Sequence, residues 1–288
     1  MEKLLNGFES LCFDKNLIKI RNKLISEERL DFNDAKAIME TQDINSLGIL
    51  SSSVKEKMHG KKVYFVVNRH INPSNVCAIS CKFCAFGKPK GHSDAYEMSM
   101  EKILSLVSNE LKEIHIVGGL HPDWKFEKYL EIVREVSKAA PDAHIKAFTA
   151  VEIDWFSQIS GKSVSKVISD LMNAGVDALP GGGAEIFSPE VRKKICTPKT
   201  TGDSWLEIHR EAHKQGLPSN ATILYGHLES YDDVIDHVSR LRDLQDDTNG
   251  FFAFIPVLFQ PFNTRLSKIK PFPFSYDLKI HSLARLYL

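Results

Sequence analysis

The chain has 288 residues, of which 43% are hydrophobic and 26% are charged, a balance typical of globular proteins. Its 37 lysines and arginines equal its 37 aspartates and glutamates, so it lacks the excess of cations that general nucleic-acid binding requires. The N-terminus has no uninterrupted apolar core of the signal-peptide kind, and no stretch approaches the roughly 18 apolar residues of a membrane span. We therefore expect a cytoplasmic protein with neither a nucleic-acid nor a membrane partner.

Residues 1–60 are predicted to form a polar, helical extension. Apolar side chains recur at loose helical spacing between charged residues, for example at Ile18, Leu24 and Ile38. The sequence changes character after residue 60, and residues 63–67 form a β-branched and aromatic run typical of a buried strand. We place a boundary between residues 60 and 61, with a β/α unit over residues 61–288.

Strand-like and helix-like segments alternate through the rest of the chain. Further strands are expected at 113–119, 144–151, 176–183, 219–226 and 251–259, and Gly, Pro and polar residues gather at their C-terminal ends. Six parallel strands joined by right-handed crossovers can form an open sheet or a barrel. We favour an α/β fold with a partial (β/α)6 barrel of the TIM type, whose active site faces the strands' C-terminal ends. The sequence stops within a helical pattern, so we expect a truncated C-terminal end.

Three of the five cysteines fall within eight residues, in CxxxCxxC spacing: Cys77, Cys81 and Cys84. A loop this short can place three thiolates around one face of a [4Fe–4S] cluster without supplying a fourth, which leaves one iron free to chelate a small molecule. A structural zinc site completed by His70 or His92 is the alternative metal interpretation, and a chance grouping of buried thiols is the other.

The motif CxxxCxΦC after a first strand, with Phe83 as the aromatic residue Φ, resembles the signature of the radical S-adenosylmethionine (SAM) superfamily. The resemblance implies that the open iron binds SAM and that one electron releases methionine and a 5′-deoxyadenosyl radical. It implies that the backbone near Phe83 meets the adenine, that Gly118 and Gly119 approach the SAM amino group, and that Glu185 accepts hydrogen bonds from the ribose. Thr149, at another strand end, is grouped with these cofactor-binding residues.

Two of these interpretations have alternatives. Many superfamily members have Gly-Gly-Glu where this chain has Gly-Gly-Leu, so Gly118 and Gly119 are also consistent with a tight turn. Glu185 is equally consistent with a carboxylate at a helix N-terminus.

Seven longer segments are together similar to the aminofutalosine synthases of the futalosine route to menaquinone: NRHINPSNVC, VGGLHPDW, HIKAFTAVEIDWF, LPGGGAEIF, GDSWLEIHREAH, SNATILYGH and FIPVLFQPFNT. The similarity implies addition of the adenosyl radical to 3-[(1-carboxyvinyl)oxy]benzoate, aryl migration and loss of a carboxylate, giving 6-amino-6-deoxyfutalosine. It also implies a low-potential electron donor such as flavodoxin or ferredoxin. Dehypoxanthine futalosine cyclase, the deazaflavin-chromophore synthases and a catalytically incompetent Fe–S or SAM-binding domain remain alternatives.

Such a substrate has two carboxylates, which cationic and amide side chains near strand ends would hold. His70, Asn72 and Ser74 precede the cysteine loop and are candidates to face the barrel interior. Arg210 and Arg265 are candidates for a carboxylate clamp, because guanidinium groups pair with carboxylates in bidentate fashion. For each arginine the alternative is an ordinary salt bridge in solvent.

Overall fold

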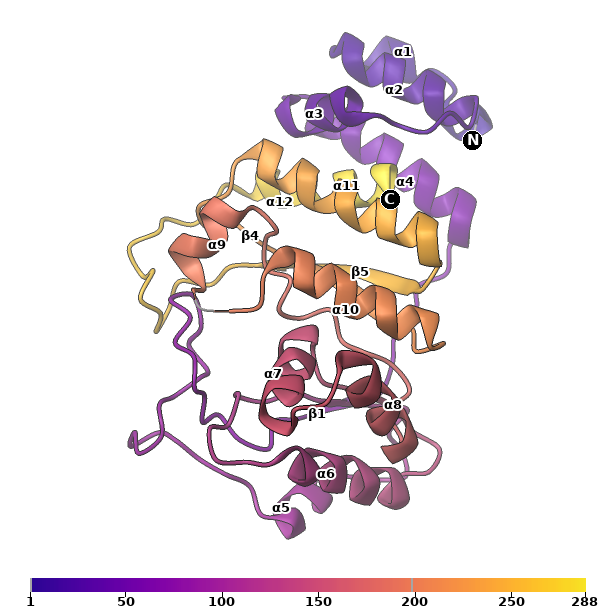
Figure 1. The fold of residues 1–288 in the computed structure, drawn as a ribbon. Coiled ribbons are helices and arrows are strands. Elements are labelled where there is room, and N and C mark those ends of the chain that lie inside the picture. The colour runs from indigo at the N-terminus through magenta and orange to yellow at the C-terminus, as the bar shows by residue number, and fades with distance from the viewer. Residues whose placement is uncertain (1, 198) are drawn as a thin grey trace.

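Five parallel strands form the sheet of the computed structural model, which describes residues 2–197 and 199–288 (Figure 1). The strands are β1 (Asn68–Ile71), β2 (Glu113–Ile116), β3 (His144–Ala147), β4 (Ser219–Tyr225) and β5 (Phe251–Leu258). Strand β2 lies between β1 and β3, and β4 pairs with β5. Single bridges from Lys146 to Ala178 and from Leu179 to Ser219 connect the two groups. Neighbouring strands therefore follow chain order, as in a β/α barrel, and the described residues form part of a barrel without closing it.

Helices cover one face of this sheet, and the chain both begins and ends with helices. Those after the first strand are α5 (Met100–Leu104), α6 (Phe126–Ala139), α7 (Ala150–Ser160), α8 (Val164–Ala174), α9 (Pro189–Ile195), α10 (Gly202–Lys214), α11 (Tyr231–Thr248) and α12 (Phe274–Tyr287). Those before it are the 3-10 helix η1 (Glu2–Leu5), α1 (Phe8–Leu11), α2 (Lys15–Ile25), α3 (Phe32–Glu40) and α4 (Ile44–His59). No helix among the described residues combines the length and apolarity needed to cross a membrane.

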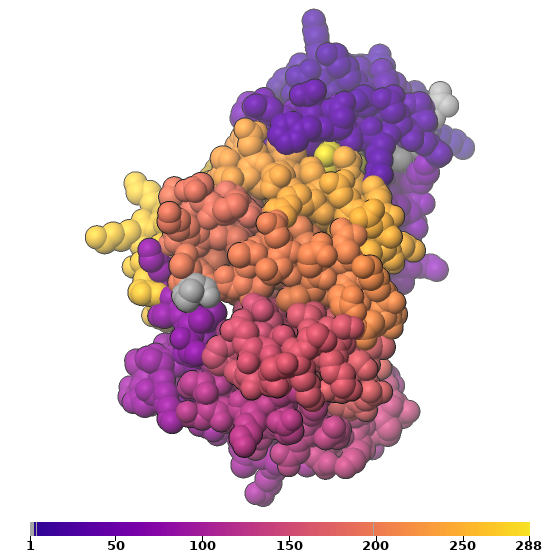
Figure 2. All heavy atoms as spheres, in the orientation of Figure 1, coloured from indigo at the N-terminus to yellow at the C-terminus, as the bar shows by residue number. Residues whose placement is uncertain are grey.

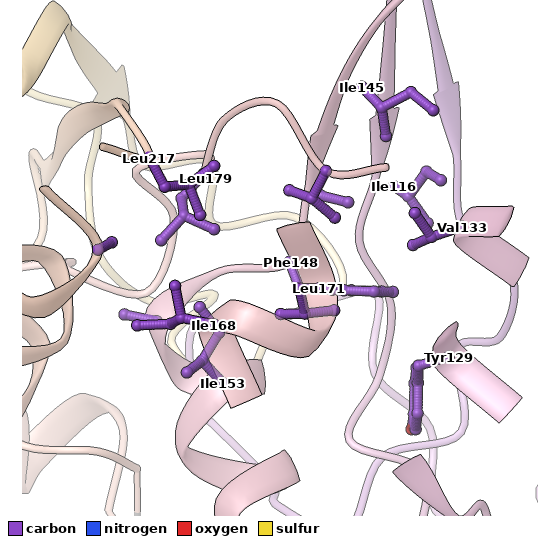
Figure 3. Packing of buried hydrophobic residues seen from close by; sticks show 14 of the residues in the cluster. Ile116, Tyr129, Val133, Ile145, Phe148, Ile153, Ile168, Leu171, Leu179 and Leu217 are labelled. Carbon is purple, nitrogen blue, oxygen red and sulfur yellow. The ribbon is translucent and has the colours of Figure 1, made fainter. Parts of the chain in front are cut away.

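The first apolar core lies between the sheet and the helices that follow β1. Figure 3 shows Ile116 and Ile145 on their strands, with Val133 of α6 and Leu171 of α8 beside them. All four side chains are at most 1% exposed. Their burial on one face of β2 and β3 leaves the alternate residues of these strands on the opposite face.

The second apolar core joins the two ends of the chain. Leu17 of α2 and Ile38 of α3 belong to the same buried cluster as Val234 of α11 and Leu283 of α12. Figures 1 and 2 show the N-terminal segment against α11 and α12, at the end of the molecule opposite α5 and α6. The first 60 residues are thus helical and share a core with the C-terminal helices.

Four of the six predicted strands differ from the observed ones. The strand expected at 176–183 does not form: Ala178 and Leu179 make single bridges to Lys146 and Ser219, and Pro180, which lacks an N–H, follows directly. The strand expected at 113–119 ends at Ile116, before the turn at Gly118 and Gly119.

Residues 63–67 are not a buried strand: they precede β1, and their side chains are 47 to 91% exposed. They precede the edge strand of the described sheet, and the carbonyl of Val67 accepts from the N–H of Lys112 (2.9 Å), the residue before β2. The predicted strand at 144–151 ends at Ala147, because Thr149 and Glu152 form a capping box that begins α7.

Candidate functional site

The cysteine loop follows β1 and is held by three separate parts of the chain. The N–H of Ala78 donates to the carbonyl of Leu120, after β2 (2.8 Å), and that of Lys82 donates to the carbonyl of Ile195, at the end of α9 (2.7 Å). The N–H of Arg265 donates in turn to the carbonyl of Lys82 (3.0 Å). The loop is therefore fixed at the carboxyl ends of the strands, where β/α barrels place their active sites.

One backbone amide points at each of two of the three sulfur atoms. The N–H of Leu120 points at the Sγ of Cys77 (3.4 Å), and that of Gly87 at the Sγ of Cys84 (3.3 Å). A Cβ on Gly87 would stand 3.8 Å from both sulfurs, so the glycine leaves space beside them. Hydrogen bonds of this kind stabilise thiolate ligands and tune Fe–S clusters.

The third sulfur, on Cys81, is partly buried near Lys199. Burial raises the pKa of the Cys81 thiol to about 12, against the opposing effect of the Lys199 cation. A free Cys81 therefore stays protonated at neutral pH, and metal binding would have to displace its proton. All three thiols are free of disulfides. Among the described residues no three His, Cys, Asp or Glu side chains are close enough to hold a single metal ion.

Gly118 and Gly119 form the turn after β2, directly beneath the cysteine loop. A Cβ on Gly119 would stand 2.2 Å from the carbonyl oxygen of Val76, and one on Gly118 would stand 3.0 Å from that of Ser74. The N–H of Gly119 donates to the Ser74 carbonyl (2.9 Å). Close packing of two loops thus requires these glycines, whatever contact they make with SAM.

A buried carboxylate joins the Gly-Gly turn to α7. Glu152, 3% exposed, accepts hydrogen bonds from the N–H of Gly118 on Oε1 (2.9 Å) and from the N–H and hydroxyl of Thr149 on Oε2 (both 2.8 Å). Burial raises the pKa of Glu152 to about 7, although these hydrogen bonds oppose the rise. The Thr149 hydroxyl is occupied by this capping box, a contact that the sequence interpretation did not include.

Glu185 and Lys199 form a buried ion pair beside Cys81 and Phe83. Lys199 contacts the Oε1 of Glu185, and its Nζ lies 5.2 Å from the centre of the Phe83 ring. Both side chains of the pair are about one-tenth exposed. Glu185 has φ of 49°, an unusual left-handed conformation for a residue with a side chain, of the kind that is common at functional sites. Sequence reasoning found Glu185 and missed Lys199, which carries no motif of its own.

The three residues before the cysteine loop have different surroundings. His70 is exposed on β1, and its ring centre lies 4.6 Å from that of His115 on β2. The side-chain amide of Asn72 donates to the carbonyl of Val117 (2.8 Å). Ser74 is 1% exposed, and its hydroxyl both donates to the Tyr96 carbonyl and accepts from the N–H of Val76, so it supports the loop instead of facing the barrel interior.

The two candidate arginines lie in different places. Arg265 donates to the carbonyl of Ser80 in the cysteine loop, so it is part of the site's framework. Arg210 lies in a surface groove between α10 and α11, where it pairs with Asp247 (2.7 Å) and Glu207 (3.3 Å). The structure thus shows the salt-bridge alternative for Arg210, and because this groove is on the helical layer outside the sheet, we leave Arg210 out of the proposed site.

Three further polar residues lie on the inner face of the sheet and were not singled out from the sequence. The carboxylate of Glu113 on β2 contacts the Nε2 of His115 on the same strand (2.6 Å) and the Nζ of Lys146 on β3 (2.7 Å). The signal was present in two of the strands: in Glu113–Ile116 and His144–Ala147 polar and apolar residues alternate, which places the polar residues of each strand on one face.

Comparison with known families agrees with this architecture. The family model described as the radical SAM superfamily matches residues 71–241, more than half of the chain and all three cysteines of the loop. The chain belongs to the radical SAM superfamily. It is therefore a radical SAM enzyme, and enzymes of this kind use a [4Fe–4S] cluster and SAM. The described thiols and amides fit such a cluster, with Cys77, Cys81 and Cys84 as the residues that would hold it.

This radical SAM chain is similar to several curated proteins, among them two synthases and a transferase. It is 41% identical to the aminodeoxyfutalosine synthase of Thermus thermophilus over 96% of this chain and 76% of the relative. The aminodeoxyfutalosine synthase of Streptomyces coelicolor is 44% identical over 84% of this chain and 64% of the relative. The 5-amino-6-(D-ribitylamino)uracil–L-tyrosine 4-hydroxyphenyl transferase of Methanopyrus kandleri is 41% identical over 80% and 65%. The chain thus spans 64 to 76% of the length of these three relatives.

A solved structure supports the radical SAM fold. The crystal structure of methylornithine synthase has a TM-score of 0.72 to this chain, over 93% of this chain and 76% of that one, at 20% identity. At this identity the likeness concerns the fold and not the substrate.

Proposed function

We propose that this radical SAM enzyme joins the adenosyl group of SAM to 3-[(1-carboxyvinyl)oxy]benzoate and so forms 6-amino-6-deoxyfutalosine for menaquinone biosynthesis. The observation that supports it most strongly is the 41% identity to the Thermus synthase over 96% of the chain. Bound cluster and SAM would supply the 5′-deoxyadenosyl radical. The chain's own residues would bind the two reactants, hold them at reacting distance and exclude water.

In this proposal two groups of residues have separate tasks. Cys77, Cys81 and Cys84 hold the cluster, and the neighbouring Phe83, Gly118, Gly119, Thr149 and Glu185 form the SAM side of the site. His70 and Asn72, with Arg265 at the loop, belong to the substrate side. Glu185 is the best supported of the SAM residues, because it is buried beside Cys81 and held by Lys199 in a strained backbone conformation.

A second candidate function is the hydroxyphenyl transfer of the Methanopyrus relative, which has the same 41% identity. We favour the synthase reaction because the Thermus similarity extends over 96% of this chain, against 80% for the transferase. Dehypoxanthine futalosine cyclase, represented by a 32% identical relative of Halalkalibacterium halodurans, is less similar.

We further propose a flavodoxin or ferredoxin as the electron donor and the cytoplasm as the compartment. A reducing compartment keeps thiols and an oxygen-sensitive cluster intact.

The test is mass spectrometry of an anaerobic reaction containing the cluster-loaded protein, a reductant, SAM and 3-[(1-carboxyvinyl)oxy]benzoate. A product that contains the adenosyl group supports the proposal. Free 5′-deoxyadenosine without an adduct would overturn the synthase reaction while keeping radical chemistry on another substrate. Intact SAM despite a full cluster would indicate a binding domain without catalysis.

A further inference from the structure

A row of polar side chains crosses the inner face of the sheet, where β/α barrels usually pack branched apolar residues. Ile116 and Ile145 belong to the apolar core that the sheet shares with α6 and α8 (Figure 3), so the residues beside them in the strands face the other way. The strand register places His70, His115 and Lys146 opposite one another on β1, β2 and β3. Each stands one residue before the end of its strand, below the turns that hold the cysteine loop.

Glu113 fixes two members of this row. Its Oε1 lies 2.6 Å from the Nε2 of His115, and its Oε2 lies 2.7 Å from the Nζ of Lys146. Burial alone would raise the pKa of Glu113, but the hydrogen bonds from Lys146 and His115 outweigh it and lower the pKa. Glu113 is therefore an anion whose two oxygens are both occupied, and it orients the lysine and the histidine together.

An apolar wall stands beside the lysine. The Nζ of Lys146 lies 4.8 Å from the centre of the Phe252 ring on β5, and the lysine is only 4% exposed. Phe252 itself is 52% exposed, and Ile255 and Val257, which pair with inner-face positions of β4, are more than 40% exposed. The inner face thus combines a buried cation with accessible aromatic and aliphatic surface.

Asn220 adds an unused polar group to the same face. It is 3% exposed, and its side-chain oxygen has no hydrogen-bond partner among the described residues. Its neighbours Ala221 and Ile223 belong to the two helix-facing cores, so Asn220 and Thr222 face inward. A buried amide without a partner carries a free-energy cost that a bound ligand would remove.

The buried pair of Glu113 and Lys146 is not expected to contribute much to the stability of the fold. A buried ion pair is often no more stabilising than apolar side chains of the same volume, so its presence in a barrel core points to another role. An ammonium group has three hydrogen-bond donors, and Glu113 is its one charged partner among the described residues. The remaining donors, set against an aromatic ring, suit a ligand that joins a carboxylate to an arene.

We propose that Lys146, oriented by Glu113 and flanked by Phe252, anchors the ring carboxylate of an aromatic carboxylate substrate. This rests on the proposed function, which it deepens by assigning one end of 3-[(1-carboxyvinyl)oxy]benzoate. The lysine lies below the strand ends, so a benzoate group bound there directs the vinyl ether toward the cysteine loop. The aryl ring then lies against Phe252 and the exposed part of β5.

The test removes the Lys146 charge from the protein and, separately, the ring carboxylate from the ligand. The double variant E113Q/K146M replaces the ion pair without leaving an unpaired buried charge, and E135Q/K138M makes the same change at an exposed pair on α6. Dissociation constants are measured by calorimetry with cluster-loaded, unreduced protein and SAM, for 3-[(1-carboxyvinyl)oxy]benzoate and for 2-phenoxyacrylate, which lacks the ring carboxylate. Cluster absorption and thermal unfolding check that each variant is folded.

Wild type and E135Q/K138M should bind the complete ligand about 10- to 100-fold more tightly than 2-phenoxyacrylate. In E113Q/K146M this preference should fall to about twofold or less, because the carboxylate has lost its partner. A preference that persists undiminished in E113Q/K146M overturns the assignment of Lys146.

A further ligand separates this inference from the proposed function. If wild-type protein forms no adenosyl adduct but binds 3-hydroxybenzoate in a Lys146-dependent manner, the proposed reaction fails and the carboxylate site stands. If wild-type protein forms the adduct and E113Q/K146M keeps the full ligand preference, the reaction stands and the site fails. Wild-type protein that binds none of these aromatic carboxylates overturns the site.

Discussion

Burial and a neighbouring cation have opposite effects on the pKa of the Cys81 thiol. Burial raises its pKa and the Lys199 ammonium lowers it, with burial the larger effect. The same lysine pairs with Glu185 and lies over the ring of Phe83, so one side chain links the cysteine loop to the residue proposed to hold the SAM ribose. At the residue scale the site is therefore a single connected unit.

Replacing Cys81 with Ala should abolish the cluster, since one iron would lose its only protein ligand. Iron and sulfide content and visible absorption after anaerobic reconstitution measure this. Cys12→Ala, which removes a thiol outside the loop, should retain the full cluster content. A full-strength cluster spectrum in the Cys81 variant would contradict the ligand assignment.

Glu185→Gln should weaken SAM binding about tenfold and affect substrate binding less, because it removes the acceptor proposed for the ribose and the counter-charge of buried Lys199. Calorimetric titration of cluster-loaded protein with SAM measures this. Glu190→Gln, on the exposed side of α9, is the matched control. Equal SAM affinity in the two variants would remove Glu185 from the site.

At the scale of elements, the turn after β2 and the cysteine loop are packed backbone against backbone. Gly119→Ala should disrupt this contact, because the added Cβ would lie 2.2 Å from the Val76 carbonyl oxygen. We expect a loss of about 2 kcal/mol or more in the free energy of unfolding, together with reduced cluster content. Denaturant unfolding and iron analysis measure the two effects.

Gly48→Ala is the control for this substitution. Gly48 lies within α4, and a Cβ there would meet no atom within 4 Å. It should stabilise the protein by about 0.5–1 kcal/mol, because alanine is the better helix former. Similar effects of the two alanine variants would show that the close approach at Gly119 is unimportant.

Helices α10 and α11 pack on β4 through histidines that should make the protein sensitive to acid. Burial, with a smaller effect of Arg210, lowers the pKa of His213 to about 4, and burial lowers that of His237 to about 3. Because these folded-state pKa values lie below the unfolded value of 6.5, their contribution to stability is present above pH 6.5 and is lost as pH falls toward 4 and below.

We expect the free energy of unfolding to fall by about 1–3 kcal/mol between pH 6.5 and 4. In the His213→Gln variant this fall should be smaller. Denaturant unfolding of cluster-free protein at a series of pH values measures it. His281→Gln, at an exposed histidine of α12, should leave the pH dependence as in wild type. If His213→Gln is equally acid-sensitive, that histidine does not carry the effect.

At the scale of the whole molecule, the N-terminal helices and the C-terminal helices share one apolar core. The Nζ of Lys279 in α12 donates to the carbonyl of Met39 (2.9 Å), and Arg242 of α11 donates to that of Leu30 (2.8 Å). The proposed boundary between residues 60 and 61 thus lies between a helical segment and the β/α unit, while the two ends of the chain pack against each other (Figure 1).

Removal of residues 1–60 should therefore expose apolar side chains of α11 and α12 and cause aggregation. The intact chain should unfold in one cooperative transition, because the first 60 residues do not bury their apolar faces alone. Calorimetry of the intact chain and size-exclusion chromatography of the shortened one check this. Two separate transitions, or a soluble monomeric shortened chain, would contradict it.

Several features were readable from short patterns because local chemistry specifies them. The CxxxCxxC spacing limits three thiols to one loop, and Gly118 and Gly119 permit close backbone approach. Helices α6, α8, α10 and α11 follow the apolar periodicity, and the last three begin at a Ser or Thr cap. The order of strands and helices indicated a partial β/α barrel, which the parallel succession of β1 to β5 confirms.

Other features depended on which segments meet in space. The apolar run at 63–67 is predicted to be a buried strand, yet its side chains are exposed, because among the described residues it precedes β1, the edge strand of the sheet. Arg210 reads as a possible clamp, yet its helix faces it toward Asp247. Lys199 and Lys146 have no motif, and their importance arises because distant residues supply Glu185, Glu113 and Phe252 as neighbours. Charge pairing and burial are properties of contacts, so they were decided only when the chain folded.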